Sequence, residues 1–272
     1  PFKDYDIKII NLADEMHNPP ESYEELPRFY SELTQRLEQE EKMDIVGISS
    51  YNSNYYIPTL TIGWVIRETM PEASILVGGY GPTTKPNDFL KPNQPFDYVF
   101  LGEADLEFNR VVNEIKDLPP NKRQIDRNQS PHRINCSQIP NLNALPSIKW
   151  EIMADSPLIK EKFILVPYYA SRGCPFNCRY CCDHSNFENY KKIWRPKTVE
   201  KAINEIQSAY NFFSNQTIGL IFDDPLFGFK KKWKSKFLTK FVPIAQDWSN
   251  IGFWLEDRVE LIQKEDLQAY KK

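Results

Sequence analysis

The sequence has no apolar run that approaches the ~20 residues of a membrane-spanning helix. It also lacks an excess of positive charge, because 34 lysines and arginines stand against 37 acidic residues and the net charge is −3. A balance of this kind gives no support for a nucleic-acid-binding surface. No segment with the pattern of a signal peptide opens the chain. These absences predict a protein whose partners include neither a membrane nor a nucleic acid.

Cysteine is also scarce, with five residues in a chain of 272, and four of them lie within positions 174–182. Loops as short as these cannot be bridged without strain, so a disulfide framework is not indicated. Clustered thiols outside disulfides predict a reducing, cytoplasmic location. The fifth cysteine, Cys136, is predicted to be an ordinary buried or linker residue.

The two ends of the sequence have unusual features for a complete protein. The chain begins at Pro1 and not at methionine, and a strand-like run follows within a few residues. It stops at Lys272, inside a predicted helix. We therefore expect the sequence to be a fragment of a longer protein.

The clustered cysteines stand at the spacing C-x3-C-x2-C, directly after the apolar run of residues 163–170. The run predicts a strand, and Cys174, Cys178 and Cys181 then lie on the loop that leaves its end. Three thiolates on one loop can hold three irons of a [4Fe–4S] cluster and leave the fourth iron open to another ligand. A zinc site of three cysteines and His184 is the main alternative, although zinc sites usually pair two separated C-x2-C motifs. Cys182 is predicted to be a spare thiol.

The first half of the sequence alternates strand and helix patterns. Such alternation predicts a parallel sheet with helices on both faces, whose ligands bind beyond the carboxyl ends of the strands. The predicted strands are residues 5–12, 44–50, 74–79 and 96–101, and the helices are residues 21–42, 58–70 and a segment that ends near 116. Small or polar residues follow three strands: Ser49, Ser50, Gly78, Gly79, Gly102 and Glu103. Two interpretations stay open, because these residues either let a large ligand approach the backbone or form ordinary tight turns.

The second half repeats the alternation after a stretch rich in proline and asparagine, which predicts a linker over residues 119–162. Strands are predicted at 163–170, 218–222 and 251–255, with helices at 199–213, from about 230, and from 264. Three such units fit half of a (β/α) barrel, in which catalytic residues lie at the carboxyl ends of the strands. The cysteine loop, Asp223-Asp224 and the segment 256–258 would then share one face. The paired acids could equally cap the following helix, whose lysines are predicted to form a solvated face.

At this point the sequence resembles a known family. The cysteine loop, with the aromatic Tyr180 before the third cysteine, is similar to the cluster loop of radical S-adenosylmethionine (SAM) enzymes. The resemblance implies that the three cysteines bind a [4Fe–4S] cluster and that SAM chelates its open iron. It also implies reductive cleavage of SAM to a 5′-deoxyadenosyl radical, with a flavodoxin or ferredoxin as the electron donor. The segments around Asp223, Asp224 and Arg258 resemble the second and third strand ends of these barrels, which implies contacts to SAM or in its pocket.

The first half resembles the cobalamin-binding domain that precedes the barrel in one class of these enzymes. The resemblance implies a fold class of a flavodoxin- or Rossmann-like parallel sheet followed by a partial barrel. Its domains would span residues 1–118 and 163–272, with the linker between them. By position, the pocket for the cofactor's nucleotide tail would be lined by Ser49, Ser50, Gly78 and Gly79, with Gly102 and Glu103 at the neighbouring strand end. The chain departs from the family in one respect, because it has no D-x-H-x-x-G motif and His17 stands in the wrong place to ligate cobalt.

The resemblance favours methyl transfer through cobalamin to an unreactive carbon of a small molecule or peptide as the activity. Other radical reactions, such as ring rearrangement, belong to the same class. Two alternatives stay open. One is a radical SAM protein whose first domain binds no cobalamin, and the other is a zinc-stapled binding module without catalysis.

Overall fold

The computed structural model describes residues 5–10, 22–51, 55–154, 156–181, 190–191 and 193–271, without the side chains of residues 157 and 158. It divides into two compact units. Among the described residues, the first unit holds 22–139 with Tyr190 and Lys191, and the second holds 5–10, 140–181 and 193–271. No helix in the described part of the chain is long and apolar enough to cross a membrane.

The first unit is built on a parallel sheet with the strand order β1-β2-β3-β4. Its strands are β1 (Ile45–Ser49), β2 (Ser74–Gly78), β3 (Tyr98–Leu101) and β4 (His132–Asn135). Its α-helices are α2 (Leu26–Glu38), α3 (Tyr56–Thr69), α4 (Tyr80–Thr84), α5 (Pro86–Phe89) and α6 (Glu107–Asp117). Two short 3-10 helices, η1 (Tyr23–Glu25) and η3 (Pro120–Lys122), complete the unit.

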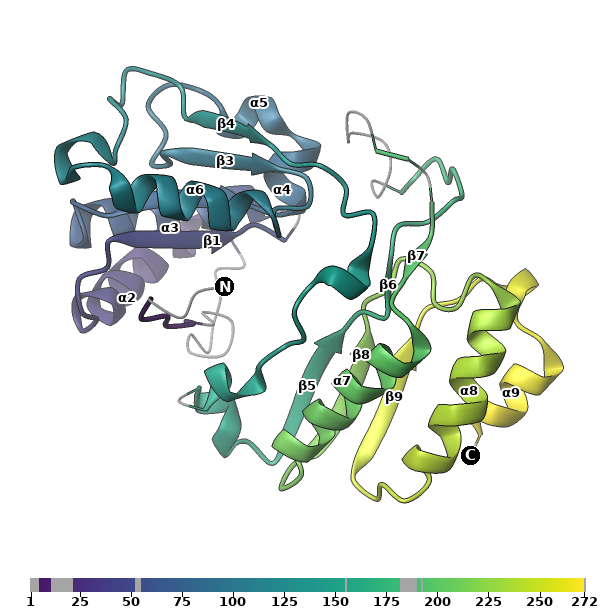
Figure 1. The fold of residues 1–272 in the computed structure, drawn as a ribbon. Helices are drawn as coiled ribbons and strands as arrows, with labels where there is room; N and C mark the ends of the chain where they lie inside the picture. The colour runs from purple at the N-terminus through teal and green to yellow at the C-terminus, as the bar shows by residue number, and fades with distance from the viewer. Residues whose placement is uncertain are drawn as a thin grey trace. The chain divides into compact units, whose positions relative to one another are not determined.

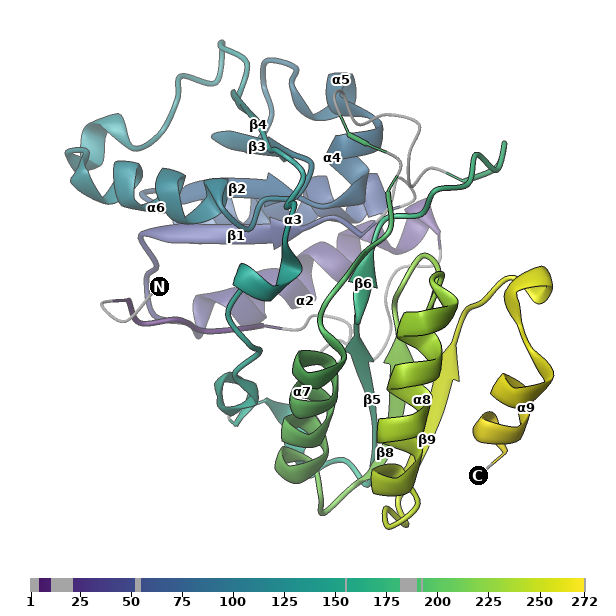
Figure 2. The ribbon, with the colours of Figure 1, turned by 45° about the vertical axis from the view of Figure 1, so that its right-hand side comes forward.

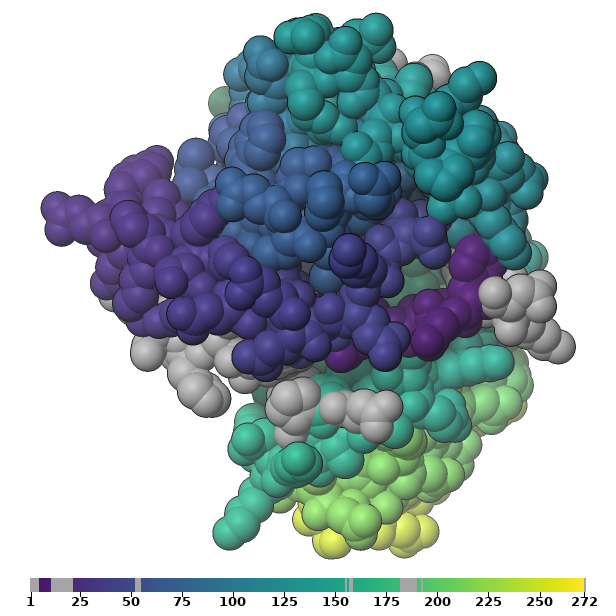
Figure 3. All heavy atoms as spheres, turned by 90° about the vertical axis from the view of Figure 1, so that its left-hand side faces the viewer, coloured from purple at the N-terminus to yellow at the C-terminus, as the bar shows by residue number. Residues whose placement is uncertain are grey.

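Helices lie on both faces of this sheet, as the alternation predicts (Figure 1). Helix α6 covers the face of Gly47, where the Phe108 ring lies 3.6 Å from the position that a Cβ atom would take. Helix α3 packs on the other face, and α2 packs against α3. On the face of the molecule that Figure 3 shows, α2 and the helices and strands that follow it in the first unit form one continuous surface, coloured purple to blue.

Two predictions about the first half of the sequence are corrected. The predicted strand at 5–12 is absent over its described part, because residues 5–10 form no strand, and residues 11 and 12 lie outside the described residues. The predicted linker over 119–162 contains β4, which pairs with β3 from Tyr98↔His132 to Leu101↔Asn135. This strand is short and exposed, so its sequence lacks the apolar run that marks the other three. The domain boundaries at residues 118 and 163 stay a prediction.

The second unit contains a parallel sheet with the order β5-β8-β9 and a short antiparallel pair, β6-β7. Its strands are β5 (Phe163–Tyr168), β6 (Ser171–Arg172), β7 (Arg195–Pro196), β8 (Thr217–Phe222) and β9 (Ile251–Leu255). Its α-helices are α7 (Val199–Phe212), α8 (Lys231–Ala245) and α9 (Lys264–Tyr270). The 3-10 helices are η4 (Leu142–Ala144), η5 (Trp150–Met153), η6 (Pro157–Lys160) and η7 (Val259–Leu261).

Helices α7 and α8 cover one face of the β5-β8-β9 sheet (Figure 2). Alternate residues of β5, namely Ile164, Val166 and Tyr168, are buried in the core beneath these helices. The residues between them point to the opposite face, where Phe163 and Leu165 are each 55% exposed. Thr198 caps α7 as predicted, since its side chain accepts a hydrogen bond from the Lys201 N–H at 3.2 Å.

The first unit is held together at a single buried carboxylate, that of Asp97, which has no exposed surface. Its two oxygens pair with Arg67 at 2.6 Å and Arg127 at 2.5 Å, and they accept the N–H groups of Ile75 at 2.8 Å and Ile125 at 3.1 Å. The carboxylate therefore joins the start of β2, helix α3 and the segment before β4.

We predict that Asp97→Ala lowers the free energy of unfolding by about 3–5 kcal/mol, because it leaves two guanidinium groups and two N–H groups without their acceptor. Denaturant unfolding followed by circular dichroism measures the change. Asp88→Ala is the matched control, since the exposed Asp88–Lys91 pair contributes roughly 0–1 kcal/mol. Equal effects of the two substitutions would contradict the role given to Asp97.

Candidate functional site

The cysteine loop is closed at its base by the β6-β7 pair. Ser171 pairs with Pro196 and Arg172 with Arg195, so the chain leaves the sheet and returns beside itself. Gly173 follows β6 with a φ of +77°, and a Cβ atom there would lie 2.4 Å from the Ile193 carbonyl oxygen. Only glycine fits this crossing without strain. The base of the loop is therefore fixed by local backbone geometry.

The three cysteines of the loop form no disulfide and are partly exposed. The Cys181 N–H donates to the Cys178 carbonyl at 3.1 Å, which forms a turn between the second and third cysteine. Among the residues that the structure describes, no three His, Cys, Asp or Glu side chains are arranged as a ready metal site. The thiols thus share one loop, and their sulfur atoms do not yet form a ligand set. Cys182 and His184 lie outside the described residues.

Arg258, at the end of β9, lies against this loop. Its Nη1 donates to the Cys178 sulfur at 3.5 Å, and its guanidinium carbon lies 4.0 Å from the centre of the Phe176 ring. Tyr180 is 92% exposed, and a hydrogen bond to Cys178 raises the pKa of its hydroxyl. The structure therefore brings Arg258 to the cysteines, as the shared strand-end face predicts.

Asp224 lies under the start of the loop and not at a helix cap. Its carboxylate accepts the Ala170 N–H at 2.9 Å and the Ser171 hydroxyl, and it is almost fully buried. Burial raises the pKa of Asp224 to about 7, although the hydrogen bonds from Ser171 and Ala170 oppose the rise. Helix α8 begins at Lys231 without a side-chain cap, so the capping interpretation is wrong for Asp224. Asp223 is exposed at the same strand end.

Two buried lysines support the site, and both were missed in the sequence. Lys197 pairs with Glu205 at 2.7 Å and lies 4.0 Å from the centre of the Tyr169 ring. Lys234 pairs with Asp257 at 2.5 Å and with Asp266 at 3.2 Å. The prediction that the α8 lysines form a solvated face is therefore wrong for Lys234. No local signal marks either lysine, because most of their acidic partners are distant in sequence.

In the first unit, the ends of β1 and β2 meet. The Ser50 N–H donates to the Gly78 carbonyl at 2.8 Å, and the Gly81 N–H donates to the Ser50 carbonyl at 3.0 Å. Gly79 has a φ of +102°, and a Cβ atom there would lie 2.5 Å from the Ser50 oxygen. Ser50 is buried and Ser49 is exposed. Ser50 and Gly79 thus have a structural reason to be small, and Ser49 faces solvent at the strand end.

Tyr190 occupies the neighbouring end of β3. Its hydroxyl accepts the Glu103 N–H at 2.5 Å and lies 2.5 Å from where a Cβ atom of Gly102 would be. The Glu103 side chain in turn accepts the Ile139 N–H at 2.8 Å. The predicted residues Gly102 and Glu103 are therefore in contact with a tyrosine that the sequence did not indicate.

No protein-family model matches the chain. The chain is 24% identical over 283 residues to an uncharacterized methyltransferase of Pyrococcus horikoshii, which covers 99% of this chain and 55% of the relative. It is 23% identical over 260 residues to the anaerobic magnesium-protoporphyrin IX monomethyl ester cyclase of Cereibacter sphaeroides, covering 89% of this chain and 40% of that enzyme.

A solved structure has the same fold. The apo form of OxsB, a cobalamin-dependent S-adenosylmethionine radical enzyme, matches with a TM-score of 0.54 and 16% identity over 90% of this chain. These likenesses support the predicted resemblance to radical SAM enzymes of the cobalamin-domain class. The predicted fold class is confirmed, because the chain has two parallel α/β sheets in succession and shares the fold of such an enzyme. The chain spans about half the length of the curated relatives that it matches.

The donor set of the cysteine loop fits an iron–sulfur cluster. Cluster iron takes cysteine thiolates, and the loop supplies three thiols that are neither oxidised nor fully buried. Cys136 differs, because burial raises the pKa of its thiol to about 12, so this side chain stays protonated.

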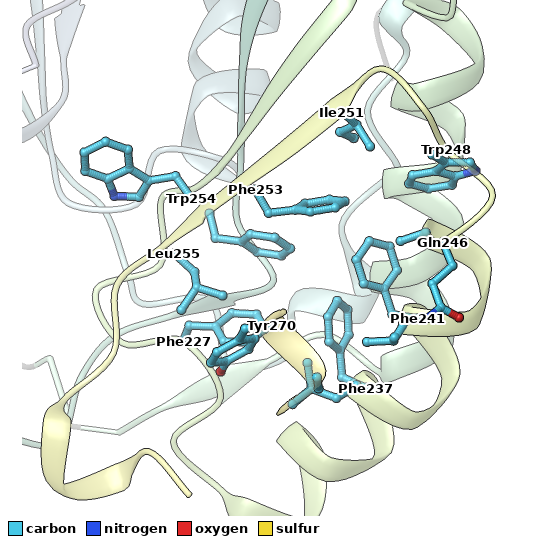
Figure 4. A pocket seen from close by; sticks show the side chains of 15 residues that line it. Phe227, Phe237, Phe241, Gln246, Trp248, Ile251, Phe253, Trp254, Leu255 and Tyr270 are labelled. Carbon is cyan, nitrogen blue, oxygen red and sulfur yellow. The ribbon is translucent and has the colours of Figure 1, made fainter. Parts of the chain in front are cut away.

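An apolar pocket of about 590 Å³ lies among β9, α8 and α9 (Figure 4). Aromatic rings line most of it, including Phe237, Phe241 and Tyr270. It contains none of the predicted site residues. The pocket is therefore separate from the cysteine loop.

The pKa of Asp224 predicts how pH affects stability. Since the folded chain binds this proton more tightly than the unfolded chain, the stabilisation is fully present below pH ~4 and declines as the pH rises to about 7. The slope would be up to about 1.4 kcal/mol per pH unit. Denaturant unfolding at pH 4 to 8 should show this slope in the unsubstituted protein and lose it in Asp224→Asn. Asp223→Asn, at the exposed neighbouring residue, is the control and should keep the pH dependence of stability. If Asp223→Asn loses this dependence and Asp224→Asn keeps it, the assignment to Asp224 is overturned.

Proposed function

We propose that the protein is a radical SAM enzyme that holds a [4Fe–4S] cluster on Cys174, Cys178 and Cys181. The observation that carries the proposal is the set of three reduced cysteines on one loop beyond the carboxyl end of a parallel strand, with Arg258 against the central cysteine. This placement is typical of active sites in parallel βα barrels. The similarity to radical SAM relatives over nearly the whole chain supports it.

When bound, the reduced cluster would supply one electron to the sulfonium of SAM, whose C5′–S bond would break to give methionine and a 5′-deoxyadenosyl radical. The residues of the chain have the tasks of binding and orientation. Asp224 fixes Ala170 and Ser171 at the start of the loop, and the β6-β7 pair fixes its end. Arg258 places a positive charge beside a ligand sulfur. Asp223, exposed at the end of β8, is available to the amino group of SAM.

We further propose methyl transfer to an unreactive carbon, with cobalamin bound at the carboxyl ends of β1 to β3. The methyltransferase relative and the cobalamin-dependent structural neighbour favour this reaction. A small molecule or a peptide would be the substrate, and a flavodoxin or ferredoxin the reductant. Cysteines outside disulfides fit a reducing, cytoplasmic location.

One observation favours a second candidate, a radical SAM protein whose first unit binds no cobalamin. Other atoms of the chain already occupy the space beside Ser50, Gly79 and Gly102. Tyr190 lies at the end of β3, where its hydroxyl contacts Glu103. A zinc-stapled module without catalysis is the remaining alternative.

Anaerobic reconstitution with iron and sulfide tests the main proposal. We expect about four irons and four sulfides per chain, and an electron paramagnetic resonance signal of the reduced cluster that changes when SAM is added. Ala substitution of Cys174, Cys178 or Cys181 should abolish the signal, because each removes an iron ligand. Cys136→Ala is the matched control and should keep it. One zinc per chain without sulfide would contradict the enzyme proposal and support the zinc module.

Incubation with hydroxocobalamin, followed by gel filtration and absorbance spectroscopy, separates the two radical SAM candidates. If cobalamin binds, Ser49→Trp should weaken binding by about tenfold or more, a loss of about 1.4 kcal/mol, because an exposed indole would obstruct the end of β1. Glu32→Trp, on the exposed side of α2, should bind as the unsubstituted protein does. No retained cobalamin in the unsubstituted protein would favour the second candidate.

A further inference from the structure

The guanidinium group of Arg258 makes a specific contact with one cysteine of the loop. Its Nη1 lies 3.5 Å from the Cys178 sulfur, within the range of a hydrogen bond to sulfur. The guanidinium carbon also lies over the Phe176 ring, 4.0 Å from its centre. Arginine favours stacking of this kind, since its planar charge is weakly hydrated. Two contacts from different directions thus orient the group on the loop.

The backbone that carries Arg258 is anchored from beneath. The Arg258 N–H donates to the Asp257 carboxylate at 2.8 Å, whose other oxygen pairs with Lys234 at 2.5 Å. Lys234 is buried and also donates to the Leu261 carbonyl at 3.0 Å. The end of β9 is further tied to the β8 side through the Phe227 N–H, which donates to the Glu256 carbonyl at 3.0 Å. The buried Lys234–Asp257 ion pair therefore fixes the backbone position of Arg258.

The ring beneath the guanidinium is held as well. Phe176 packs edge-on against Phe229 with centroids 5.9 Å apart, and Phe229 packs against Trp194 at 6.2 Å. The Trp194 N–H donates to the Leu226 carbonyl at 3.0 Å. This aromatic chain fixes the loop side of the contact, as the Lys234–Asp257 pair fixes the strand side.

We propose that Arg258 is a tuning residue, which raises the reduction potential of the cluster through its hydrogen bond and charge at the Cys178 sulfur. Reduction adds negative charge to the cluster, and a donor at a ligand sulfur stabilises that charge. Glu260, which pairs with Arg258 at 2.6 Å, lies on the outer side and offsets part of the charge. The inference rests on the proposed function, because it requires that the loop hold a cluster.

The test is a redox titration of the reconstituted protein followed by electron paramagnetic resonance, with iron content measured in parallel. Arg258→Gln should keep the iron and shift the midpoint potential to a more negative value. The midpoint potential of Arg258→Lys should lie between those of the unsubstituted protein and Arg258→Gln. The lysine keeps a positive charge but loses the guanidinium contact with Phe176. Arg179→Gln is the matched control: it removes the same charge from an exposed residue next to Cys178, and solvent screening should leave its potential close to that of the unsubstituted protein.

Each outcome separates this inference from the proposed function. An unsubstituted protein that takes up no cluster overturns the proposed function and this inference with it. A cluster whose potential is the same in Arg258→Gln overturns this inference alone. An equal shift in Arg179→Gln also overturns it, because general charge would then replace the specific contact. If Arg258→Gln fails to hold iron, Arg258→Lys decides, and an unchanged potential there contradicts the tuning role.

Discussion

The second unit depends on one buried carboxylate, that of Asp224. It accepts the backbone N–H of Ala170, where β5 ends, and the hydroxyl of Ser171, where β6 begins. A buried N–H without an acceptor is costly, so these bonds stabilise the chain where it leaves the sheet. Asp224 therefore holds the residues that lead into the cysteine loop.

The two units use the same physical device at different places. Asp97 lies just before β3 and accepts the N–H groups of Ile75 and Ile125, while Asp224 lies just after β8 and accepts that of Ala170. In both, a carboxylate satisfies backbone donors where regular strand pairing begins or ends. The difference is in the counter-charge. Asp97 has two arginines within hydrogen-bonding distance, whereas burial dominates at Asp224 and raises its pKa to about 7.

The described contacts also show how a loop rich in thiols is held in place. Its base is clamped by β6 and β7, its aromatic side is fixed through Phe229, and a cation lies at its central cysteine. Among the described residues, the sulfur atoms do not form a set of metal ligands. The local backbone and the aromatic contacts therefore fix the loop around its thiols.

Local patterns in the sequence determined much of this protein. Apolar runs identified the strands β1, β2, β3, β5, β8 and β9, and the C-x3-C-x2-C spacing identified the loop, because strand burial and thiol spacing are local properties of the chain. The sequence could not show β4, whose residues are mostly exposed, or the true role of Asp224, since its partners lie more than fifty residues away. Lys197, Lys234 and Tyr190 were missed for a related reason. From sequence alone, a lysine and a loop tyrosine are predicted to face solvent. Only the folded chain places a carboxylate or a strand end against them. The tertiary structure alone decided these contacts, because burial and charge pairing depend on segments that meet only after folding.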